Sequence, residues 1–241
     1  VAVSNYKRIF PNLNKKEIDK NINECWEQLG RTFAEISILN KILDKNNFKI
    51  KITGKDILQN IKAKNQQVIF FGIHQANWEL LPPVIDKFDI KLAAIYRHIN
   101  NPYINKFILL IRKKTISSKE SFYTPKGKES AKDIVSAIRK GFSIILLIDQ
   151  KDNAGETVKL FNYDAKTQLG FLKIAKKHNL KLVPLQIVRK KINEFNIIIH
   201  PSIKTLNENN KYQTINEIHS TIEKWIIENP NQWFWQHKRF S

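Results

Sequence analysis

The sequence predicts a single α/β domain, in which a mostly parallel central sheet is covered by helices on both faces. Short, continuously apolar runs such as VIFFGI at 68–73 and FSIILLI at 142–148 are typical of strands that are buried on both sides. Segments with apolar residues at helical spacing alternate with these runs, and that alternation favours a parallel sheet. The 241 residues are enough for one such core.

We expect residues 1–45 to form an N-terminal helical segment and residues 46–241 to form the α/β core. Asn14 and the Lys15, Lys16 and Glu17 that follow it are typical of a helix start. Apolar residues then recur at helical spacing, which predicts a long amphipathic helix over roughly 15–44. These residues are Ile18, Ile22, Trp26, Leu29, Phe33, Ile36 and Leu43.

The core elements follow from the same two patterns. FKIKITG at 48–54 alternates with period two and ends in glycine, as a half-buried strand does. The remaining strands are short apolar runs, and the helices lie between them. In chain order we expect a strand at 48–54, a helix at 55–64, a strand at 68–73, a helix at about 77–87, a strand at 91–96, helices at about 102–113 and 127–140, a strand at 142–148, a helix at about 167–178, strands at 180–188 and 194–200, a helix at 213–229 and an aromatic tail.

The chain is strongly basic, with 41 Lys and Arg residues against 22 acidic ones and a net charge of +19. Such a charge attracts nucleic acid, anionic lipid or an acidic protein, although a codon bias toward Lys, Asn and Ile is an equal explanation for much of it. The chain has no recognisable motif for reading nucleic acid and no basic stripe along one helix, so we expect no nucleic-acid partner. A basic nucleic-acid-binding domain is therefore the less favoured class.

Cys25 is the one cysteine and lies in an apolar-periodic stretch, so we expect it to be a small core residue. The chain has no HExxH helix, no glycine-rich phosphate loop and no CxxC pair. We therefore expect neither a metal nor a cofactor.

His74 and Asp149 each follow an apolar strand, which is where open α/β sheets place their chemistry. Glu79 lies five positions after His74, or about 140° away if both were on one helix. We therefore expect His74 in the turn before the helix and Glu79 in its first turn, with the carboxylate folding back onto Nδ1. Nε2 would then be a general base acting on a substrate hydroxyl, since the sequence has no Gly-x-Ser-x-Gly elbow and no reactive cysteine nearby. The alternative is a histidine that caps a helix or closes the core edge.

Five ordered blocks resemble the lysophospholipid acyltransferase superfamily, specifically the lipid A biosynthesis lauroyl/myristoyl acyltransferases of Gram-negative bacteria. They are NYKRIFPNLNKKEIDKNINECWEQLGRTFAE, GIHQANWE, IYRHINNPYINKFI, ILLIDQKDNAGETVKLFNYDAKTQLGFLKIAKKHNLKLVPL and PNQWFWQHKRF. In the second block, Ala76 fills a place usually held by a small residue. The fourth block departs from the family, because LFNY at 160–163 replaces a Phe-Phe-Gly element. The chain also has no Met and lacks the family's hydrophobic N-terminal anchor, so we expect that an upstream membrane anchor is missing.

This resemblance implies a glycerolipid acyltransferase-like fold and an O-acyltransferase of lipid A and lipopolysaccharide biosynthesis. It implies transfer of an acyl chain from acyl carrier protein to a hydroxyl of a lipid A precursor, at the cytoplasmic face of the bacterial inner membrane. A lysophospholipid or glycolipid acceptor is the alternative. The basic surface would suit the acidic carrier protein, the anionic lipid and the membrane surface alike.

The resemblance also implies roles for individual residues. His74 matches the family's base and Glu79 its partner, while Asp149 matches an important aspartate through its Asp-Gln pair. For the family's functional arginine we prefer Arg112 to Arg97; Arg112 would bind a phosphate or the oxyanion, with a surface ion pair as the alternative. The remaining candidates for contact with the substrate or oxyanion are Asn77 and Gln150.

The aromatic tail has two readings. Trp233, Phe234 and Trp235, beside Lys238 and Arg239, could sit at the bilayer interface or pack into the core.

Overall fold

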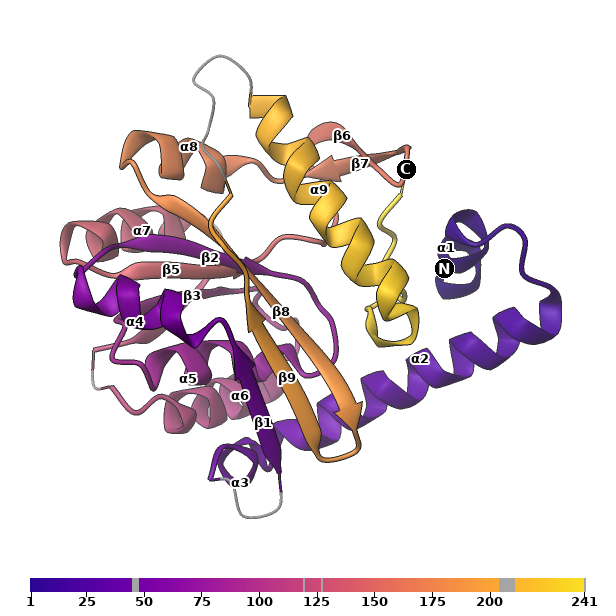
Figure 1. Ribbon diagram of the computed structural model, residues 1–241, viewed down its shortest axis with the longest axis horizontal. Coiled ribbons are helices and arrows are strands. Elements are labelled where there is room, and N and C mark those ends of the chain that lie inside the picture. Colours follow the sequence, from indigo (N-terminus) through magenta and orange to yellow (C-terminus); the bar gives the residue numbers. More distant parts are fainter. Residues whose placement is uncertain (45–47, 119, 127, 204–210, 241) are drawn as a thin grey trace.

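The computed structural model describes residues 1–44, 48–118, 120–126, 128–203 and 211–240 (Figure 1). The boundary expected between residues 45 and 46 lies outside these ranges. Within them, no helix has both the length and the apolar character that a bilayer crossing requires.

The described part of the chain forms one sheet of seven strands. Neighbouring strands are parallel except for β8 and β9, so the predicted mostly parallel sheet is confirmed. β2 lies between β8 and β5, and therefore the carboxyl ends of β2 and β5 are adjacent. The strand order is β1 (Lys49–Thr53), β9 (Glu194–Ile199), β8 (Lys181–Lys191), β2 (Val68–Gly72), β5 (Ser143–Leu147), β3 (Leu92–Tyr96) and β4 (Phe122–Pro125).

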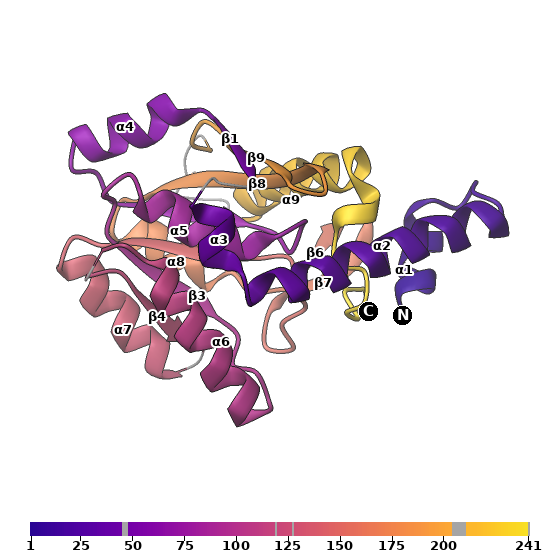
Figure 2. The same ribbon diagram turned by 90° about the horizontal axis from the view of Figure 1, so that it is seen from below.

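Helices cover both faces of this sheet, as predicted, and each face has its own apolar core (Figures 1 and 2). Side chains alternate along β2: Ile69 and Phe71 enter one core, and Val68 and Phe70 enter the other. The first core is closed by α2 (Lys15–Ile36), α7 (Lys128–Arg139), α8 (Gly170–Lys177) and α9 (Lys211–Glu228), and the second by α3 (Leu39–Leu43), α4 (Lys55–Ala63), α5 (Leu81–Asp86) and α6 (Pro102–Thr115).

Two of the expected helices are each divided in the structure. The helix expected over 15–44 begins as predicted, with a capping box between Asn14 and Glu17, but it ends at Ile36 and a turn leads into α3. That turn places the apolar residues of α3 in the second core, which Ile36 at the end of α2 also enters. The helix expected over 77–87 is a 3₁₀ turn, η1 (Trp78–Leu80), followed by α5, whose start carries Pro82 and Pro83. Proline lacks the N–H donor of a helix interior, and so it suits this fresh start.

The sequence reasoning missed several short elements: α1 (Ala2–Ile9), β4, the hairpin of β6 (Glu156–Leu160) and β7 (Tyr163–Thr167), and η2 (Pro230–Gln232). The helix expected from 167 begins only at Gly170, because Thr167 is the last residue of β7 and two residues connect the strand to the helix. The hairpin contains the segment where the family's glycine is missing. Its two turn residues, Phe161 and Asn162, have φ values of 52° and 62°, so the left-handed conformation persists without glycine.

The C-terminal aromatic tail packs into the hydrophobic core. Trp233 is 2% exposed and Trp235 is fully buried, so the bilayer-interface reading of these two residues is wrong. Arg239 is buried as well and donates to Lys166 O and Thr167 Oγ1 on β7.

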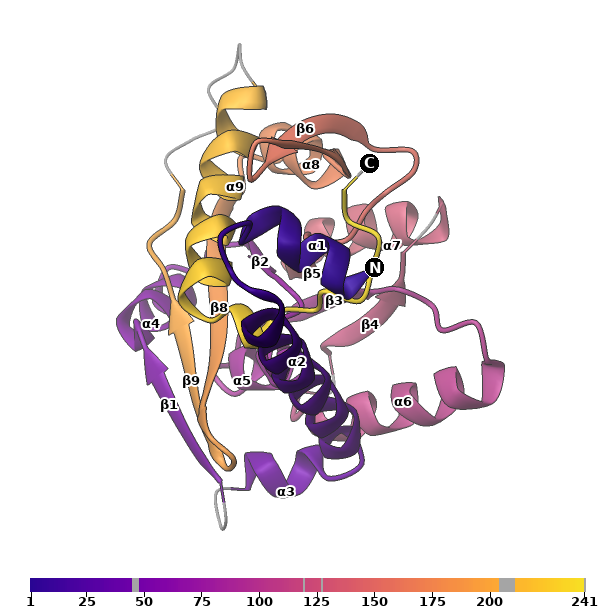
Figure 3. The same cartoon turned by 90° about the vertical axis from the view of Figure 1, so that its right-hand side faces the viewer.

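The two ends of the described chain lie side by side, as all three ribbon views show (Figure 3). Asn5 of α1 donates through Nδ2 to the carbonyl oxygens of Trp235 and His237. The ring of Tyr6 packs on Trp235 with 4.9 Å between centroids. Helix α1 therefore holds the C-terminal tail in place.

Replacing Gly54 by alanine should lower the free energy of unfolding by about 2 kcal/mol or more. Gly54 has φ +76°, and a Cβ there would lie 2.2 Å from Ile199 O. Gly30→Ala is the matched control, because a Cβ on this α2 residue would meet no atom within 4 Å. That variant should gain roughly 0.5–1 kcal/mol from helix propensity. Urea unfolding measures the change in the free energy of unfolding for both variants. Equal changes would contradict the packing of α4 on β9.

Candidate active site

His74 and Asp149 form a hydrogen-bonded pair at the carboxyl ends of β2 and β5. Nδ1 of His74 lies 2.7 Å from Asp149 Oδ1, and the backbone N–H of His74 donates to Oδ2 at 3.0 Å. The strand order explains the pair, because β2 and β5 are adjacent and parallel although the two residues are 75 positions apart. The two polar residues that follow buried strands therefore meet at one edge of the sheet.

Asp149 is 1% exposed and is held by donors from two parts of the chain. Besides the two His74 contacts, Trp233 Nε1 donates to Oδ2 at 2.8 Å. Burial alone would raise the pKa of Asp149, but the charge and hydrogen bond of His74, the charge of His237 and the hydrogen bond from Trp233 together lower it well below its usual range. The carboxylate is therefore ionised at neutral pH.

This ionised partner determines the tautomer of His74. A carboxylate only accepts hydrogen bonds, so Nδ1 carries the proton and Nε2 carries the lone pair in the neutral ring. The side chain of His74 is 16% exposed. The arrangement is that of a general base with an oriented imidazole.

The partner predicted for His74 is wrong, since the carboxylate on Nδ1 belongs to Asp149 and not to Glu79. Glu79 instead forms a bidentate pair with Arg112 of α6: Nε donates to Oε2 at 2.7 Å and Nη2 to Oε1 at 2.6 Å. The expected backbone geometry is confirmed, because His74 lies in the turn after β2 and Glu79 lies in η1. From η1 the Glu79 side chain reaches α6 rather than the imidazole.

Trp78 links the His74–Asp149 hydrogen-bonded pair to the Glu79–Arg112 ion pair. Its ring meets the His74 ring edge-on, with 5.0 Å between centroids, and its Nε1 donates to Glu79 Oε1 at 3.1 Å. The guanidinium of Arg112 lies 5.2 Å from the ring centroid of Tyr96 and 5.7 Å from that of Tyr123. Burial would lower the pKa of Arg112, but the charge and hydrogen bonds of Glu79 raise it, so the arginine stays charged.

The turn that carries these residues is held from two sides. Ala76 has φ +46°, a left-handed conformation that residues with a Cβ adopt uncommonly. Its carbonyl accepts from Thr32 of α2 at 2.8 Å, and its N–H donates to Gln232 O at 2.9 Å. The N–H of Phe234 donates to His74 O at 2.9 Å. Helix α2 and the C-terminal tail thus fix the loop that presents the imidazole.

A buried ion pair supports the Glu79 side of the turn. Arg189 of β8 donates to both carboxylate oxygens of Glu35 in α2, each at 2.7 Å. Glu35 Oε2 also accepts from Asn77 Nδ2 at 2.8 Å, and Asn77 Oδ1 in turn accepts from the N–H of Glu79. Asn77 is therefore engaged in holding η1, whereas it was expected among the groups that contact substrate or oxyanion.

The other candidates lie in different surroundings. Arg97 follows β3 and is exposed, and its charge helps to lower the pKa of Asp152. Gln150 directly follows Asp149 and is partly exposed. Arg112 pairs with Glu79, and its choice over Arg97 as the functional arginine stays a prediction.

Cys25 is a buried core residue, as expected. Burial raises the pKa of its thiol to about 12, and Sγ donates to Pro230 O. The thiolate that a nucleophile requires is therefore disfavoured.

The sequence reasoning did not place Trp233, Glu35 or Arg189 in the site. The first two stand in blocks that it quoted, the terminal Gln-Trp-x-Trp and the Glu at the end of the first helix. Membership of those blocks was the signal that could have identified Trp233 and Glu35. Their side-chain partners, Asp149 and Arg189, lie 84 and 154 positions away on other elements.

A small hollow opens beside His74, between α2, the turn after β2 and the C-terminal tail. Trp78 and Phe234, whose rings contact His74, are among its walls. It is lined by Cys25, Gln28, Leu29, Thr32, Ala76, Trp78, Gln232, Trp233 and Phe234.

A family model and two curated relatives match the chain along its whole length. A family model described as bacterial lipid A biosynthesis acyltransferase matches residues 1–241. The chain is 25% identical over 248 aligned residues to the lipid A biosynthesis palmitoleoyltransferase of Escherichia coli (strain K12), covering 100% of this chain and 78% of that protein. The same values relate it to a lipid A biosynthesis acyltransferase of Shigella flexneri. A solved 1-acyl-sn-glycerophosphate acyltransferase from Thermotoga maritima aligns over 95% of this chain and 88% of that one, with a TM-score of 0.44 and 12% identity.

Asp149→Asn should destabilise the protein at neutral pH by about 2–4 kcal/mol, because an amide nitrogen would replace one of the two oxygens that accept from His74 and Trp233 and would face a donor. The folded-state pKa of Asp149 lies below its unfolded value of about 4, so the contribution of the ionised carboxylate is complete above about pH 4 and is lost as the pH falls through the folded pKa. Urea unfolding of wild type and variant at neutral and acidic pH measures it. Asp164→Asn, in an exposed pair with Lys159, is the control and should show little difference.

Glu35→Gln should cost about 3–5 kcal/mol, because it leaves the charge of Arg189 buried without its counter-ion. Glu27→Gln removes the same charge from the same helix but breaks only the exposed pair with Arg31, and should cost about 1 kcal/mol or less. Thermal and urea unfolding compare the two. Similar losses in both variants would contradict the role assigned to the buried pair.

Proposed function

Because the chain belongs to the bacterial lipid A biosynthesis acyltransferases, we propose that it moves a fatty acyl chain from acyl carrier protein to a hydroxyl of a lipid A precursor. Membership of this family makes the protein an O-acyltransferase. The acyl donor, the acceptor and the roles of individual residues are what we propose. The observation that carries it is the His74–Asp149 pair at the sheet edge, next to the Glu79–Arg112 pair. A base and a fixed cation side by side suit attack by a hydroxyl on a carbonyl.

In the proposed reaction, Nε2 of His74 removes the proton of the acceptor hydroxyl while its oxygen attacks the thioester carbon. A C–O bond forms, the tetrahedral intermediate collapses, and the C–S bond breaks. The leaving thiolate then takes the proton from the imidazolium. Asp149 keeps Nδ1 protonated and stabilises the imidazolium, as the carboxylate does in hydrolytic triads.

Transfer is direct in this scheme, without an acyl-enzyme. The thiol nearest the hollow, Cys25, has its pKa raised to about 12 and is buried. A base that acts on the acceptor itself needs no enzyme nucleophile.

The Glu79–Arg112 pair has a different task in the proposal. Its bidentate contact uses Nε and Nη2 of the guanidinium, so Nη1 stands outside the contact. Glu79 thus holds the guanidinium in one orientation, from which Nη1 would bind the oxyanion or a phosphate of the acceptor.

The net charge of +19 supports the proposed partners. The carrier protein is acidic and the acceptor is phosphorylated, and both would be drawn to a basic surface. The proposed location is the cytoplasmic face of the bacterial inner membrane, whose anionic lipids would be attracted in the same way.

His74→Ala should remain folded and lower the rate of acyl transfer by about 10²–10⁴. His178→Ala is the matched control: His178 precedes β8, which is parallel to β2, so it lies at the opposite edge of the sheet. The assay supplies acylated carrier protein and a lipid A precursor, and mass spectrometry detects the product. Full activity of His74→Ala would contradict the mechanism. If the wild-type protein acylates a lysophospholipid and not the lipid A precursor, the proposed acceptor is wrong.

The two carboxylates should differ in their kinetic signatures. Asp149→Asn should lower kcat by about 10² or more and change its pH profile, since Asp149 acts on the base. Glu79→Gln should lower kcat/KM and leave the pH profile of kcat unchanged, since Glu79 acts on Arg112. If Glu79→Gln shifts the pH profile and Asp149→Asn does not, the original assignment of Glu79 as the partner of the base is restored.

A further inference from the structure

Helix α6 exposes a row of large apolar side chains. Tyr103 is 83% exposed, Ile104 48%, Phe107 55% and Leu110 51%. The side chains that anchor the helix to the body, Asn105, Ile108 and Thr115, are buried. Nothing in the described part of the chain covers the outer face of α6.

The exposed residues share one side of the helix. At about 100° per residue, Tyr103, Phe107 and Leu110 fall within roughly 60° of one another, and Ile104 borders them. Exposed lysines lie within and beside this row at positions 106, 113 and 114, and α6 contains no Asp or Glu. An apolar stripe with basic residues around it is typical of a helix that lies in a membrane interface.

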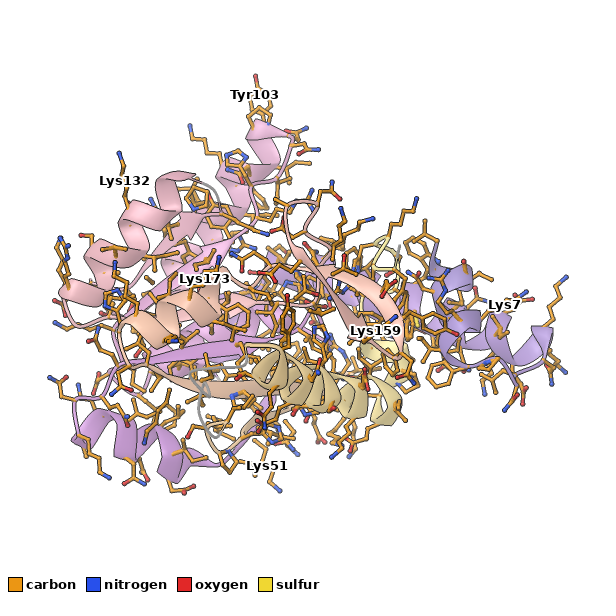
Figure 4. All side chains as sticks on the ribbon, turned by 90° about the horizontal axis from the view of Figure 1, so that it is seen from above. Lys7, Lys51, Tyr103, Lys132, Lys159 and Lys173 are labelled. Carbon is orange, nitrogen blue, oxygen red and sulfur yellow. The ribbon has the colours of Figure 1, made fainter. Side chains whose placement is uncertain are left out.

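The position of α6 connects this face to the site. Its N-terminal end stands at the outer edge of the molecule, where Figure 4 shows Tyr103 projecting away from the body. Its C-terminal part carries Arg112, which pairs with Glu79 beside His74. A surface that docks on the outer face of α6 therefore lies against the helix that contributes to the site.

The charge selects among possible occupants. A second copy of this chain would bring its own +19 charge and the same three lysines against the face. An acidic protein would complement the charge of the lysines. The four exposed large apolar side chains also require a partner that buries apolar surface. An anionic bilayer supplies both, through its headgroups and its acyl region.

We infer that the outer face of α6, formed by Tyr103, Ile104, Lys106, Phe107, Leu110, Lys113 and Lys114, docks the enzyme on an anionic lipid bilayer. The inference rests on the proposed function only in that the acceptor is a lipid. Docking would bring the membrane-embedded acceptor to the helix that holds Arg112.

The test is co-sedimentation with vesicles of phosphatidylethanolamine and phosphatidylglycerol, compared with vesicles of phosphatidylcholine alone. The double variant Phe107→Asp, Leu110→Asp should bind the anionic vesicles about tenfold or more weakly than wild type. The control Ile192→Asp, Ile227→Asp removes the same charge and two similarly exposed apolar side chains, 65% and 54% exposed, from other surfaces. It should bind nearly as wild type.

A second variant set tests the basic part of the face without changing the apolar row. Replacing Lys106, Lys113 and Lys114 by Gln should weaken binding to the anionic vesicles by about 10² and leave the small binding to neutral vesicles unchanged. Replacing Lys7, Lys51 and Lys173, which Figure 4 shows on other parts of the surface, gives the charge-matched control.

Turnover on acceptor dispersed in detergent separates docking from catalysis. Both face variants should retain near wild-type turnover and melting temperature there, and lose turnover when the acceptor is in vesicles. The proposal is overturned if the face and control variants bind vesicles equally, or if wild type binds none while it still transfers acyl groups. It is also overturned if turnover falls equally on dispersed acceptor. A raised KM for acyl carrier protein with unchanged vesicle binding would assign the face to the carrier protein instead.

Discussion

The buried carboxylate of Asp149 is the constraint on which the rest of the site depends. An ionised group at this depth is tolerated only where donors surround it, and these come from the His74 backbone, the His74 ring and the Trp233 indole. The requirement connects β2, β5 and a C-terminal segment that is far away in the sequence. It also explains why the tail is folded inside, with α1 closing over it through Asn5. The charge that orients the base thus also organises the end of the chain.

Two more buried carboxylates follow the same rule with arginine as the partner. Glu35 meets Arg189 and Glu79 meets Arg112, each through two nitrogens of the guanidinium. Asn77 joins the two pairs, since it donates to Glu35 and accepts from the N–H of Glu79. The loop between β2 and α5 has little regular structure of its own, so these contacts give it the rigidity that a positioned base requires. In this loop, side-chain hydrogen bonds fix the backbone in place of the regular backbone hydrogen bonds of a strand or helix.

The sequence was sufficient to place both His74 and Asp149 at the carboxyl edge of a parallel sheet, because each follows an apolar run. It could not show that their strands are neighbours, since the order β2-β5 depends on packing across the whole chain. The five-residue spacing therefore drew attention to Glu79, the carboxylate nearest in sequence. The β6–β7 hairpin and β4 were missed because their strands, ETVKL, YDAKT and FYTP, are not continuous apolar runs like VIFFG in β2.

The His-x4-Glu spacing keeps its meaning in the structure, although the two residues do not pair. His74 at the end of β2 and Glu79 in η1 stand on either side of Trp78, which contacts the imidazole ring and donates to the carboxylate. The spacing thus fixes how far the base stands from Arg112. Because Arg112 belongs to α6, a shift of that helix would move the guanidinium relative to the imidazole unless Glu79 held it. The bidentate pair of Glu79 and Arg112 therefore connects two parts of the molecule. One is the sheet edge that supplies the base, and the other is helix α6, whose outer face is proposed to contact the membrane.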